Sequence, residues 1–504
     1  MNQVEVQPLL PGVIPAAPHI VGREQCVRDA LQVINSTPTK MAVLVDEAGV
    51  LVRTVTDGDI RRGLLAGLEL LSPLDRLPGR SPVTCHSTAG LDTIKELLDR
   101  NDVASILMVD SDGRPVAIAA QSGAGGTIHM SPPHIGSAEL DFVRAAFEDN
   151  WVAPAGPNLD RFERQLAVVA GRAEAAAVSS GTAALHLALR VLGVRAGDRV
   201  YVSDLTFIAS LQPVLYEHAI PVLIDSEPRS WNMSPAALAR KLAQDATLGQ
   251  LPKAIILVHL YGQPAELAEI MAVADHYGVP VVEDAAESLG ASYGNRPSGA
   301  HGLLSAYSFN GNKIITTSGG GALVGDDPAL MAHARKLATQ GREPIEHYQH
   351  AEVAYNYRMS NVLAGIGIGQ LELLDARVAA RRAIFDRYRA GLGDLPGIGM
   401  QHEAADSTGN RWLSVITLDP DLIELHPFQL MRELRGRGIE CRPGWKPMHM
   451  QPLCAGYEFV PHNDGAPVSP RLFFQSLCLP SGSSLDEVQQ GRIVERIRKI
   501  ILEN

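Results

Sequence analysis

Lys313 lies in a polar, glycine-rich stretch of the chain, residues 308–321, and Asp284 ends an apolar run 29 residues earlier. An amine of this kind can hold pyridoxal phosphate as a Schiff base, and a carboxylate can keep the pyridine nitrogen of that cofactor protonated. A lysine in a turn is ordinarily a solvated surface residue. The motifs around Lys313 therefore decide between a surface lysine and a cofactor site.

Residues 179–186, SSGTAALH, open a predicted helix with small residues. The free backbone N–H groups of Gly181, Thr182 and Ala183 and the hydroxyl of Thr182 could hold a phosphate there. An ordinary helix cap has the same pattern, so this segment alone leaves both interpretations open. Phe207 follows the next apolar run and could stack on a flat cofactor, although phenylalanine is more commonly a core residue.

The acidic segment 283–287, EDAAE, ends a predicted buried strand. Acids in such a place are costly unless a positive group pairs with them. A protonated pyridinium nitrogen would be one such partner, and an arginine would be another. Ser308 and Lys313 would then supply a phosphate-binding hydroxyl and the amine.

The elements that must position these groups are short apolar runs separated by helical patterns. From about residue 129 onward such runs occur at 199–202, 254–258 and 279–282. This alternation predicts an α/β fold, a parallel sheet covered by helices on both faces. Because ligands bind beyond the carboxyl ends of strands in such sheets, the polar residues after each run are expected to share a site. Residues 361–371 form a predicted helix so rich in small residues that another element must approach it closely.

The first part of the chain contains an internal repeat with an offset of 64 residues, at 41–52 and 105–116. Each copy has the pattern of a strand, a turn of acidic residues and glycine, and a second strand. The first copy continues at 54–65 as a strand leading into a helix, which Asp57 is expected to cap. Residues 1–20 are predicted to be an arm, and residues 122–128 a flexible linker.

Length and composition bound the class of protein. The 504 residues predict two or three domains, and 46% hydrophobic with 20% charged residues is typical of a soluble globular protein. A net charge of −12 argues against a nucleic-acid partner. No apolar run reaches the roughly 18 residues that span a bilayer, and the start lacks the basic residues of a secretory signal, so we expect a cytoplasmic protein without a membrane partner. The five scattered cysteines favour reduced thiols over disulfides or a metal site.

Five motifs together carry a resemblance to a known family. They are SGTAA at 180–184, TFIAS at 206–210, VEDAAES at 282–288, SFNGNK at 308–313 and YNYRMS at 355–360. They resemble those of the DegT/DnrJ/EryC1/StrS family of pyridoxal phosphate-dependent nucleotide-sugar aminotransferases, over residues 129–504. The resemblance implies fold type I, with a mainly parallel sheet flanked by helices to about residue 375 and a smaller C-terminal α+β domain after it.

The resemblance also implies a role for each matching position. Thr182 and Ser308 would bind the cofactor phosphate, with Gly181 and Ala183 beside them. Phe207 would stack on the ring, Asp284 would pair with the pyridine nitrogen, and Glu287 would lie near the ring hydroxyl. Lys313 would form the Schiff base and move protons. Many family members have His or Gln at the position of Glu287. Asn356 would reach the cofactor phosphate of a neighbouring subunit, which implies a homodimer with shared active sites.

The segments 131–134, 150–154, 308–321 and 445–452 are most similar to the bacillosamine-pathway members, which make a UDP-4-amino sugar. A related interpretation is the corresponding enzyme of exopolysaccharide clusters. This implies L-glutamate as the amino donor and a UDP-linked 4-keto-6-deoxy sugar as the acceptor. The alternatives are 3- or 4-amination of a dTDP- or GDP-linked keto sugar, sugar dehydration, which the presence of Lys313 argues against, and a non-catalytic regulator that senses nucleotides.

Four basic residues are candidate substrate contacts: Arg358, Arg442, Lys446 and His449. The last three would form a local basic patch suited to a pyrophosphate in an otherwise acidic protein. Solvated surface charge explains the same residues equally well.

Residues 21–121 resemble a tandem CBS domain pair, in which a T-x-x-D element contacts the ribose of a bound nucleotide. Thr54 and Asp57 have this spacing in the first copy, whereas Ile118 and Gln121 stand at the equivalent positions of the second. The resemblance therefore implies at most one nucleotide effector site. A packing or oligomerisation module without a ligand is the alternative.

Overall fold

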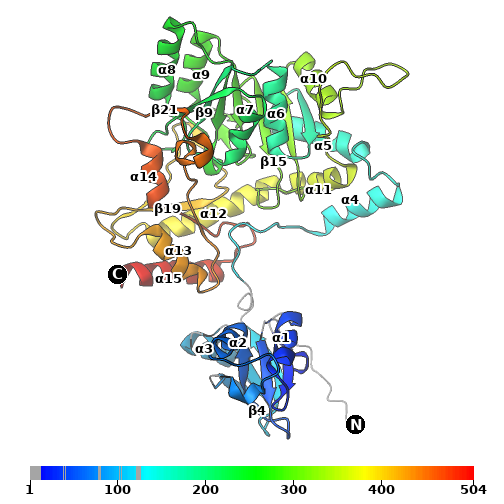
Figure 1. Cartoon of the computed structure of the whole chain (residues 1–504), viewed down its shortest axis with the longest axis vertical. Coiled ribbons are helices and arrows are strands. Elements are labelled where there is room, and N and C mark those ends of the chain that lie inside the picture. Colours follow the sequence, from blue (N-terminus) through cyan, green and yellow to red (C-terminus); the bar gives the residue numbers. More distant parts are fainter. Residues whose placement is uncertain are drawn as a thin grey trace. The chain divides into compact units, whose positions relative to one another are not determined.

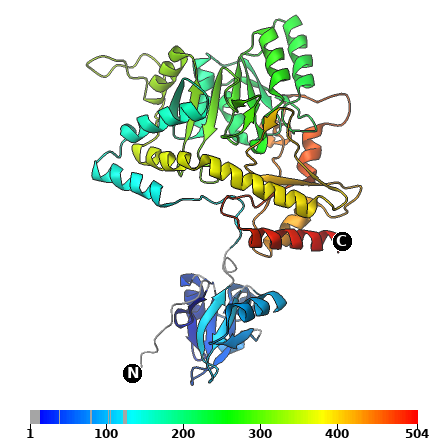
Figure 2. The ribbon, with the colours of Figure 1, turned by 180° about the vertical axis from the view of Figure 1, so that it is seen from behind.

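The computed structural model describes residues 13–37, 39, 41–77, 81–101, 103, 105–120 and 127–503 (Figures 1 and 2). The chain divides into two compact units, Met1–Ile128 and His129–Asn504, and each is described by itself. Gln121 and most of the predicted linker, residues 122–126, lie outside the described residues. Within the described residues, no helix has both the length and the hydropathy needed to cross a membrane.

The repeat in the first unit is confirmed by two matching hairpins. The strands β3 (Met41–Val45) and β4 (Leu51–Thr56) pair antiparallel, as do β6 (Ser105–Val109) and β7 (Pro115–Ala120). In each turn an aspartate carboxylate, of Asp46 or Asp110, accepts two backbone N–H bonds. Gly49 and Gly113 then take positive φ values of 77° and 78°, which residues with a Cβ rarely adopt.

The structural repeat is longer than the sequence pattern predicts. The strand β2 (Ile20–Gly22) pairs parallel with β3, and β5 (Thr84–His86), 64 residues later, pairs parallel with β6. The helices α1 (Val27–Ser36) and α3 (Leu91–Asn101) also correspond. Two sheets result, in the orders β2-β3-β4 and β1-β7-β6-β5.

Residues 13–20 are part of the fold, so the prediction that they belong to an arm is wrong. The strand β1 (Val13–Pro15) pairs antiparallel with β7. Its proline stands at the last position of a strand on the sheet edge, where the missing N–H group is tolerated. Ala16 then joins a core cluster with Val43, Leu107 and Ile118, residues of both copies.

The helix α2 (Asp57–Leu65) begins one residue after its cap, and that cap is Thr56 rather than the predicted Asp57. The Thr56 hydroxyl accepts the N–H of Asp59, and the Asp59 carboxylate accepts the N–H of Thr56 at 2.9 Å. Asp57 is instead the first helical residue, exposed and 3.0 Å from Arg61. Thr56 and Asp59 have the same T-x-x-D spacing as Thr54 and Asp57, shifted by two residues.

The second unit is built on a sheet of eight strands in the order β21-β10-β9-β11-β12-β15-β16-β8. The predicted parallel arrangement is confirmed for six strands: β21 (Glu458–Val460), β10 (Ile220–Ile224), β9 (Arg199–Ser203), β11 (Ala254–Val258), β12 (Val281–Asp284) and β15 (Leu304–Ser308). The remaining two, β16 (Gly321–Gly325) and β8 (Glu174–Val178), pair antiparallel at one edge.

Helices cover both faces of this sheet, as the continuous apolar strands predict (Figure 1). One face packs against α6 (Gly181–Val191), α7 (Gln212–Tyr216) and α10 (Pro328–Ala338). The other face packs against α5 (Pro157–Val169) and α11 (Asn361–Glu372) at one end, and α8 (Pro235–Thr247) and α9 (Leu267–Tyr277) at the other.

The predicted close approach to the glycine-rich helix α11 is confirmed. A Cβ on Gly367 would lie 2.6 Å from the ring of Phe162 in α5, and one on Gly365 would lie 3.1 Å from Phe142. A Cβ on Gly369 would meet Glu139 at 3.0 Å, and both Phe142 and Glu139 belong to α4 (Ser137–Glu148). The missing side chains therefore let two helices pack on α11.

The C-terminal part begins with the long helix α12 (Leu374–Leu392), close to the predicted boundary at 375. It carries an antiparallel sheet in the order β17-β19-β22-β20, from strands at Ile398–Met400, Ser414–Leu418, Ser476–Leu479 and Arg442–Pro443. Its other helices are α13 (Pro427–Arg435), α14 (Val468–Gln475) and α15 (Glu487–Leu502). A small sheet joins β14 (Arg296–Pro297), β13 (Ser292–Tyr293) and β18 (Ser407–Thr408).

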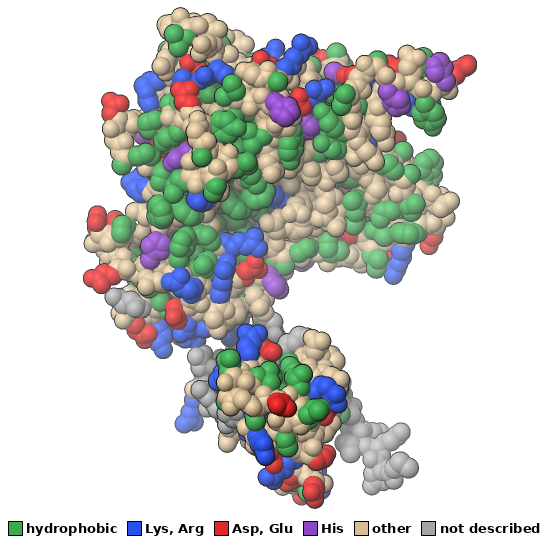
Figure 3. Space-filling view, viewed as in Figure 1, with side chains coloured by type: hydrophobic (Ala, Val, Ile, Leu, Met, Phe, Trp, Pro, Cys, Tyr) green, Lys and Arg blue, Asp and Glu red, His purple; other side chains and the backbone are tan. Residues whose placement is uncertain are grey.

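Charged side chains of both signs are interspersed over the visible face of the molecule (Figure 3). All five cysteines are free thiols. No cluster of His, Cys, Asp or Glu side chains in the described part of the chain has the arrangement of a metal site.

The capping of α2 generates a prediction. Thr56→Ala removes the cap and should destabilise the first unit by about 1 kcal/mol. Asp57→Ala removes only an exposed ion pair and a favourable helix-dipole charge, and should cost about 0.5 kcal/mol or less. Both losses of unfolding free energy are measured by chemical denaturation of the full-length variants, in which the unfolding transition of the first unit is followed. A larger loss for Asp57→Ala than for Thr56→Ala would contradict this assignment of the cap.

Candidate active site

The candidate site lies where three strands of the large sheet end. Asp284 ends β12, Ser308 ends β15, and Phe207 follows β9 by a short loop. Because β12 pairs parallel with β15, their carboxyl ends meet at one edge of the sheet. The loops that follow bring Lys313 Nζ to 3.8 Å from Glu287 Oε1, so residues distant in the sequence share one site.

Lys313 is held in a tight turn and its side chain is nearly buried. Its N–H donates to the carbonyl of Asn310 at 3.0 Å. The side chain is 13% exposed, and Nζ lies 4.1 Å from the centroid of the Trp412 ring. Burial lowers the pKa of the amine, and the nearby carboxylates of Glu287 and Asp284 partly oppose that shift. A lowered pKa increases the population of the neutral, nucleophilic amine.

The two adjacent acids of β12 point to opposite faces of the sheet and have different partners. Glu283 accepts hydrogen bonds from His259 Nε2 at 2.8 Å and from the backbone of Gly299 and His301, and Arg172 lies 3.8 Å away. The sequence left open an arginine as the partner of this acidic segment. That arginine is Arg172, and it lies beside Glu283. Asp284 has no arginine partner among the described residues.

Asp284 is buried and is oriented by hydroxyl groups. Ser210 Oγ donates to Asp284 Oδ2 at 2.6 Å, and Thr206 Oγ1 lies 2.6 Å from Ser210 Oγ. The N–H of Ala286 donates to the other carboxylate oxygen at 3.1 Å. Thr206 and Ser210 belong to the TFIAS motif, but nothing in the motif itself indicates this role. These hydrogen bonds fix the orientation of the Asp284 carboxyl group.

Glu287 is buried beside Lys313, and one of its oxygens accepts the N–H of Tyr261 at 2.6 Å. Burial raises the pKa of Glu287 to about 7, and the neighbouring Asp284 acts in the same direction. Lys313 and the Tyr261 hydrogen bond oppose that rise. Glu287 can thus hold or release a proton near neutral pH.

The start of α6 has the space and the donors for an anion. A Cβ on Gly181 would lie 3.0 Å from Ser308 Cβ, so only glycine lets the helix start this close to the end of β15. The N–H groups of Gly181 and Thr182 are at the helix start, where no carbonyl of the helix can accept them. The N–H of Ala183, in contrast, donates to Ser180 Oγ at 3.1 Å, so its place near a phosphate stays a prediction.

Phe207 is half exposed and belongs to an aromatic group whose other members no sequence motif indicates. Its ring centroid lies 5.2 Å from that of Trp445, which in turn stacks on Tyr261 at 6.2 Å. The exposed Phe207 ring is consistent with stacking on a flat molecule rather than with a core position. Trp445 and Trp412 stand in segments that are ordinary in composition, so only the fold brings them to the site.

The predicted basic patch is not formed as expected. His449 Nδ1 lies 2.8 Å from Asp204 Oδ2, and Arg442 lies 2.9 Å from Glu440 Oε1. Two of the three groups therefore have acidic partners within the chain: Glu440 is two residues from Arg442 in the sequence, whereas Asp204 is brought to His449 from 245 residues away. Lys446 is partly exposed.

Arg358 and Asn356 contact other segments of the chain than the loop that carries Lys313. The Arg358 guanidinium pairs with Glu163 and donates to the carbonyl of Ala177 at 3.2 Å, which favours a structural role over substrate binding. Asn356 is exposed and forms a backbone bridge with Thr339.

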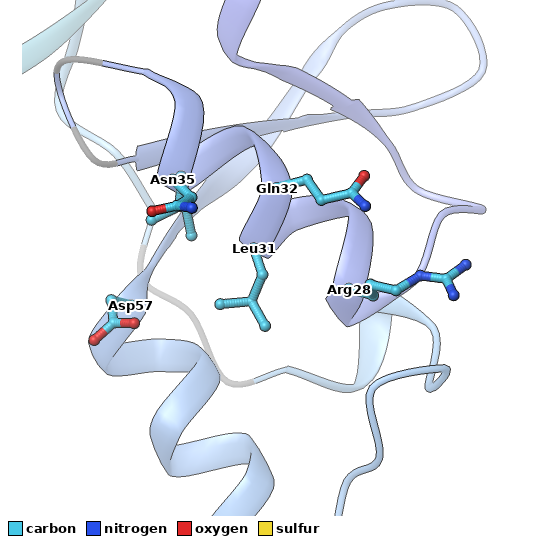
Figure 4. A pocket seen from close by; sticks show the side chains of 6 residues that line it. Arg28, Leu31, Gln32, Asn35 and Asp57 are labelled. Carbon is cyan, nitrogen blue, oxygen red and sulfur yellow. The ribbon is translucent and has the colours of Figure 1, made fainter.

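Asp57 in the first unit lines an open cavity of about 520 Å³ between α1 and the start of α2 (Figure 4). Leu31 and Asn35 lie on the side of α1 near Asp57, whereas Arg28 and Gln32 extend away from it. Thr54 is not among the lining residues. The structure therefore does not bring the predicted pair Thr54 and Asp57 together in this cavity.

Comparison with known proteins agrees with this geometry. The sequence model of the DegT/DnrJ/EryC1/StrS aminotransferase family matches residues 133–498. EpsN of Bacillus subtilis (strain 168), which carries the name of a pyridoxal phosphate-dependent aminotransferase, is 52% identical over 73% of this chain and 94% of its own length. A GDP-perosamine synthase of Caulobacter vibrioides is 35% identical over 74% of this chain and 98% of its own.

Solved structures are also similar. A DegT DnrJ EryC1 StrS aminotransferase from Brucella abortus superimposes with a TM-score of 0.67 at 29% identity, over 72% of this chain and 95% of the other. The aminotransferase TlmJ from Streptoalloteichus hindustanus gives a TM-score of 0.68 at 28% identity, over 75% of this chain and all of the other.

The contact between Glu287 and Lys313 generates a prediction. Glu287→Gln removes a negative charge 3.8 Å from the amine, so the pKa of Lys313 should fall further. The pH dependence of acetylation of Lys313 in the full-length chain freed of cofactor, read by mass spectrometry, measures the change. Glu269→Gln, on the exposed side of α9, is the matched control and should leave that pKa in place. An unchanged pKa in Glu287→Gln would show that the carboxylate does not act on Lys313.

Proposed function

Because the chain belongs to the DegT/DnrJ/EryC1/StrS aminotransferase family, we propose that it transfers the amino group of L-glutamate to a 4-keto-6-deoxy nucleotide sugar. The protein is a pyridoxal phosphate-dependent aminotransferase. The observation that carries the proposal is the buried Lys313 amine beside Glu287 and Asp284, at the carboxyl ends of parallel strands.

The residues present fit the cofactor. Asp284, which accepts a hydrogen bond from Ser210, would face the pyridine nitrogen, and the exposed Phe207 ring would stack on the flat face. The N–H groups of Gly181 and Thr182 and the hydroxyl of Ser308 would hold the phosphate, where a Cβ on Gly181 would fill the space. Pyridoxal phosphate supplies an electron sink and carries the amino group from donor to acceptor.

The chain's own groups would move the protons. Lys313 Nζ, with its lowered pKa, is a base that can take a proton from a substrate carbon and return it. Glu287, with a pKa of about 7, can exchange a proton beside it at neutral pH. The Trp412 ring next to Nζ limits access of water to the amine.

The substrate is proposed more finely as UDP-2-acetamido-2,6-dideoxy-4-keto-hexose, which would give the UDP-4-amino sugar. The segments 131–134, 150–154 and 445–452 support this choice. Because three relatives are named GDP-perosamine synthase, a GDP-linked keto sugar is the second candidate substrate.

Lys313→Ala is expected to lower turnover by at least about a thousandfold, since it removes both the amine that holds the cofactor and the base. Turnover is measured with glutamate and a panel of UDP-, dTDP- and GDP-linked 4-keto sugars. Asp284→Asn should also lose most activity, because an amide cannot stabilise a pyridinium charge as a carboxylate does. A Lys313→Ala protein that transaminates near the parent rate would disprove the assignment.

We also propose a homodimer in which Asn356 contacts the cofactor of the partner subunit. The exposure of Asn356 on the single chain supports this. Mixing Lys313→Ala and Asn356→Ala subunits under exchange should then restore activity in about a quarter of the sites, since each mixed dimer holds one undamaged site. If no activity returns although mass spectrometry shows that the subunits have exchanged, Asn356 lies outside the partner's site.

For the first unit we propose a CBS domain pair with at most one nucleotide site, supported by the 64-residue structural repeat. Calorimetric titration of the full-length protein with adenine and uridine nucleotides should show no more than one site per chain, and Asp57→Ala and Asp59→Ala distinguish the two T-x-x-D pairs. The absence of any heat of binding would leave an assembly module without a ligand.

A further inference from the structure

Arg381 of α12 is a buried guanidinium without an acidic partner among the described residues. It is 1% exposed, and burial lowers its pKa to about 9, with Arg377 acting in the same direction. A charge in such a place is tolerated only when its donors find acceptors. The acceptors of Arg381 are all neutral and come from three distant segments: Ser131 Oγ at 3.0 Å, the Ser481 carbonyl at 3.1 Å, and the Trp412 carbonyl.

Two of these acceptors converge on the peptide group that precedes Lys313. Ser131 Oγ donates to the Asn312 carbonyl at 2.6 Å, and Trp412 Nε1 donates to the same carbonyl at 2.7 Å. That carbonyl belongs to the peptide bond joining Asn312 to Lys313. Arg381 therefore binds both residues that fix the backbone at Lys313, Ser131 through its hydroxyl and Trp412 through its carbonyl.

Trp412 also contacts the functional end of Lys313. Its ring lies 4.1 Å from Nζ, and its backbone N–H donates to Asn410 Oδ1 at 2.9 Å. The Asn410 amide in turn donates to the carbonyl of Glu287 at 3.0 Å. The Trp412 backbone, which Arg381 holds, is thus joined to both members of the Lys313–Glu287 pair.

We propose that Arg381 is a positioning residue for the aminotransferase reaction, which fixes Lys313 Nζ against Trp412 and Glu287 through the two donors on the Asn312 carbonyl. The planar fork of arginine suits this role, because it reaches acceptors from separate segments in one plane. A lysine ammonium at this position cannot span all three. The proposal rests on the proposed role of Lys313.

The test compares Arg381→Lys with the parent in two assays. In the full-length chain freed of cofactor, the pKa of Lys313, read from its acetylation against pH, should rise toward the ordinary lysine value as the amine becomes more hydrated. In the holoenzyme, kcat should fall roughly 10- to 100-fold while KM changes by less than about threefold, since the geometry of the base is disturbed and not the binding of substrate.

Matched variants separate positioning from folding. Arg387→Lys changes another arginine of α12, which lies 3.4 Å from Glu487 and donates to Gln490, and should match the parent in both assays. Trp412→Phe keeps a ring beside Lys313 but removes the indole donor, and Ser131→Ala removes the other donor. Each should show part of the Arg381→Lys change in the Lys313 pKa, even if the Arg381 variant itself folds poorly.

A parent-like pKa and kcat in Arg381→Lys would overturn the proposal. So would unfolding of Arg381→Lys combined with parent-like behaviour of both Trp412→Phe and Ser131→Ala, because Arg381 would then serve the fold alone. The acetylation assay needs no substrate. If no keto sugar reacts, the proposed function is therefore refuted, but the acetylation assay still measures the effect of Arg381 on the pKa of Lys313.

Discussion

The burial of one amine beside two carboxylates is the constraint on which the site depends. Lys313, Glu287 and Asp284 are all largely buried, and burial disfavours the charged forms of Lys313 and Glu287. Hydrogen bonds from Ser210 and from the Tyr261 backbone offset that cost for the acids. Such groups retain useful protonation states only if their distances are fixed, and the surrounding loops, helix starts and aromatic rings serve to fix them.

Much of the fold could be predicted because it follows from local pattern. The continuous apolar runs gave the central parallel strands, and the glycines of α11 indicated a close approach. The antiparallel edge formed by β16 and β8 could not be predicted, since strand direction depends on partners distant in the sequence. The cap of α2 was misplaced because residues 54–59 offer several oxygen-bearing side chains in succession, and only the backbone geometry selects Thr56.

The candidate site was predictable where motifs are contiguous, as for Lys313, Asp284 and Glu287. The site was not predictable where the partner of a basic side chain comes from a distant segment of the sequence. His449 looked free in the sequence, yet Asp204 lies 245 residues earlier and contacts it. Arg381 carries no local signal either, because its acceptors at 131, 412 and 481 become neighbours only after the C-terminal part has folded.

The glycines of α11 have a consequence for how the second unit opens. Glycine in a helix interior costs about 1 kcal/mol relative to alanine, so α11 is intrinsically a weak helix. It persists because α4 and α5 pack into the space that Gly365, Gly367 and Gly369 leave, and because Asn361 Oδ1 accepts the N–H of Asn158 at the start of α5. Separation of either neighbour removes that support. The amide protons of α11 should therefore exchange with solvent in the same cooperative opening as those of α4 and α5, and not by independent fraying.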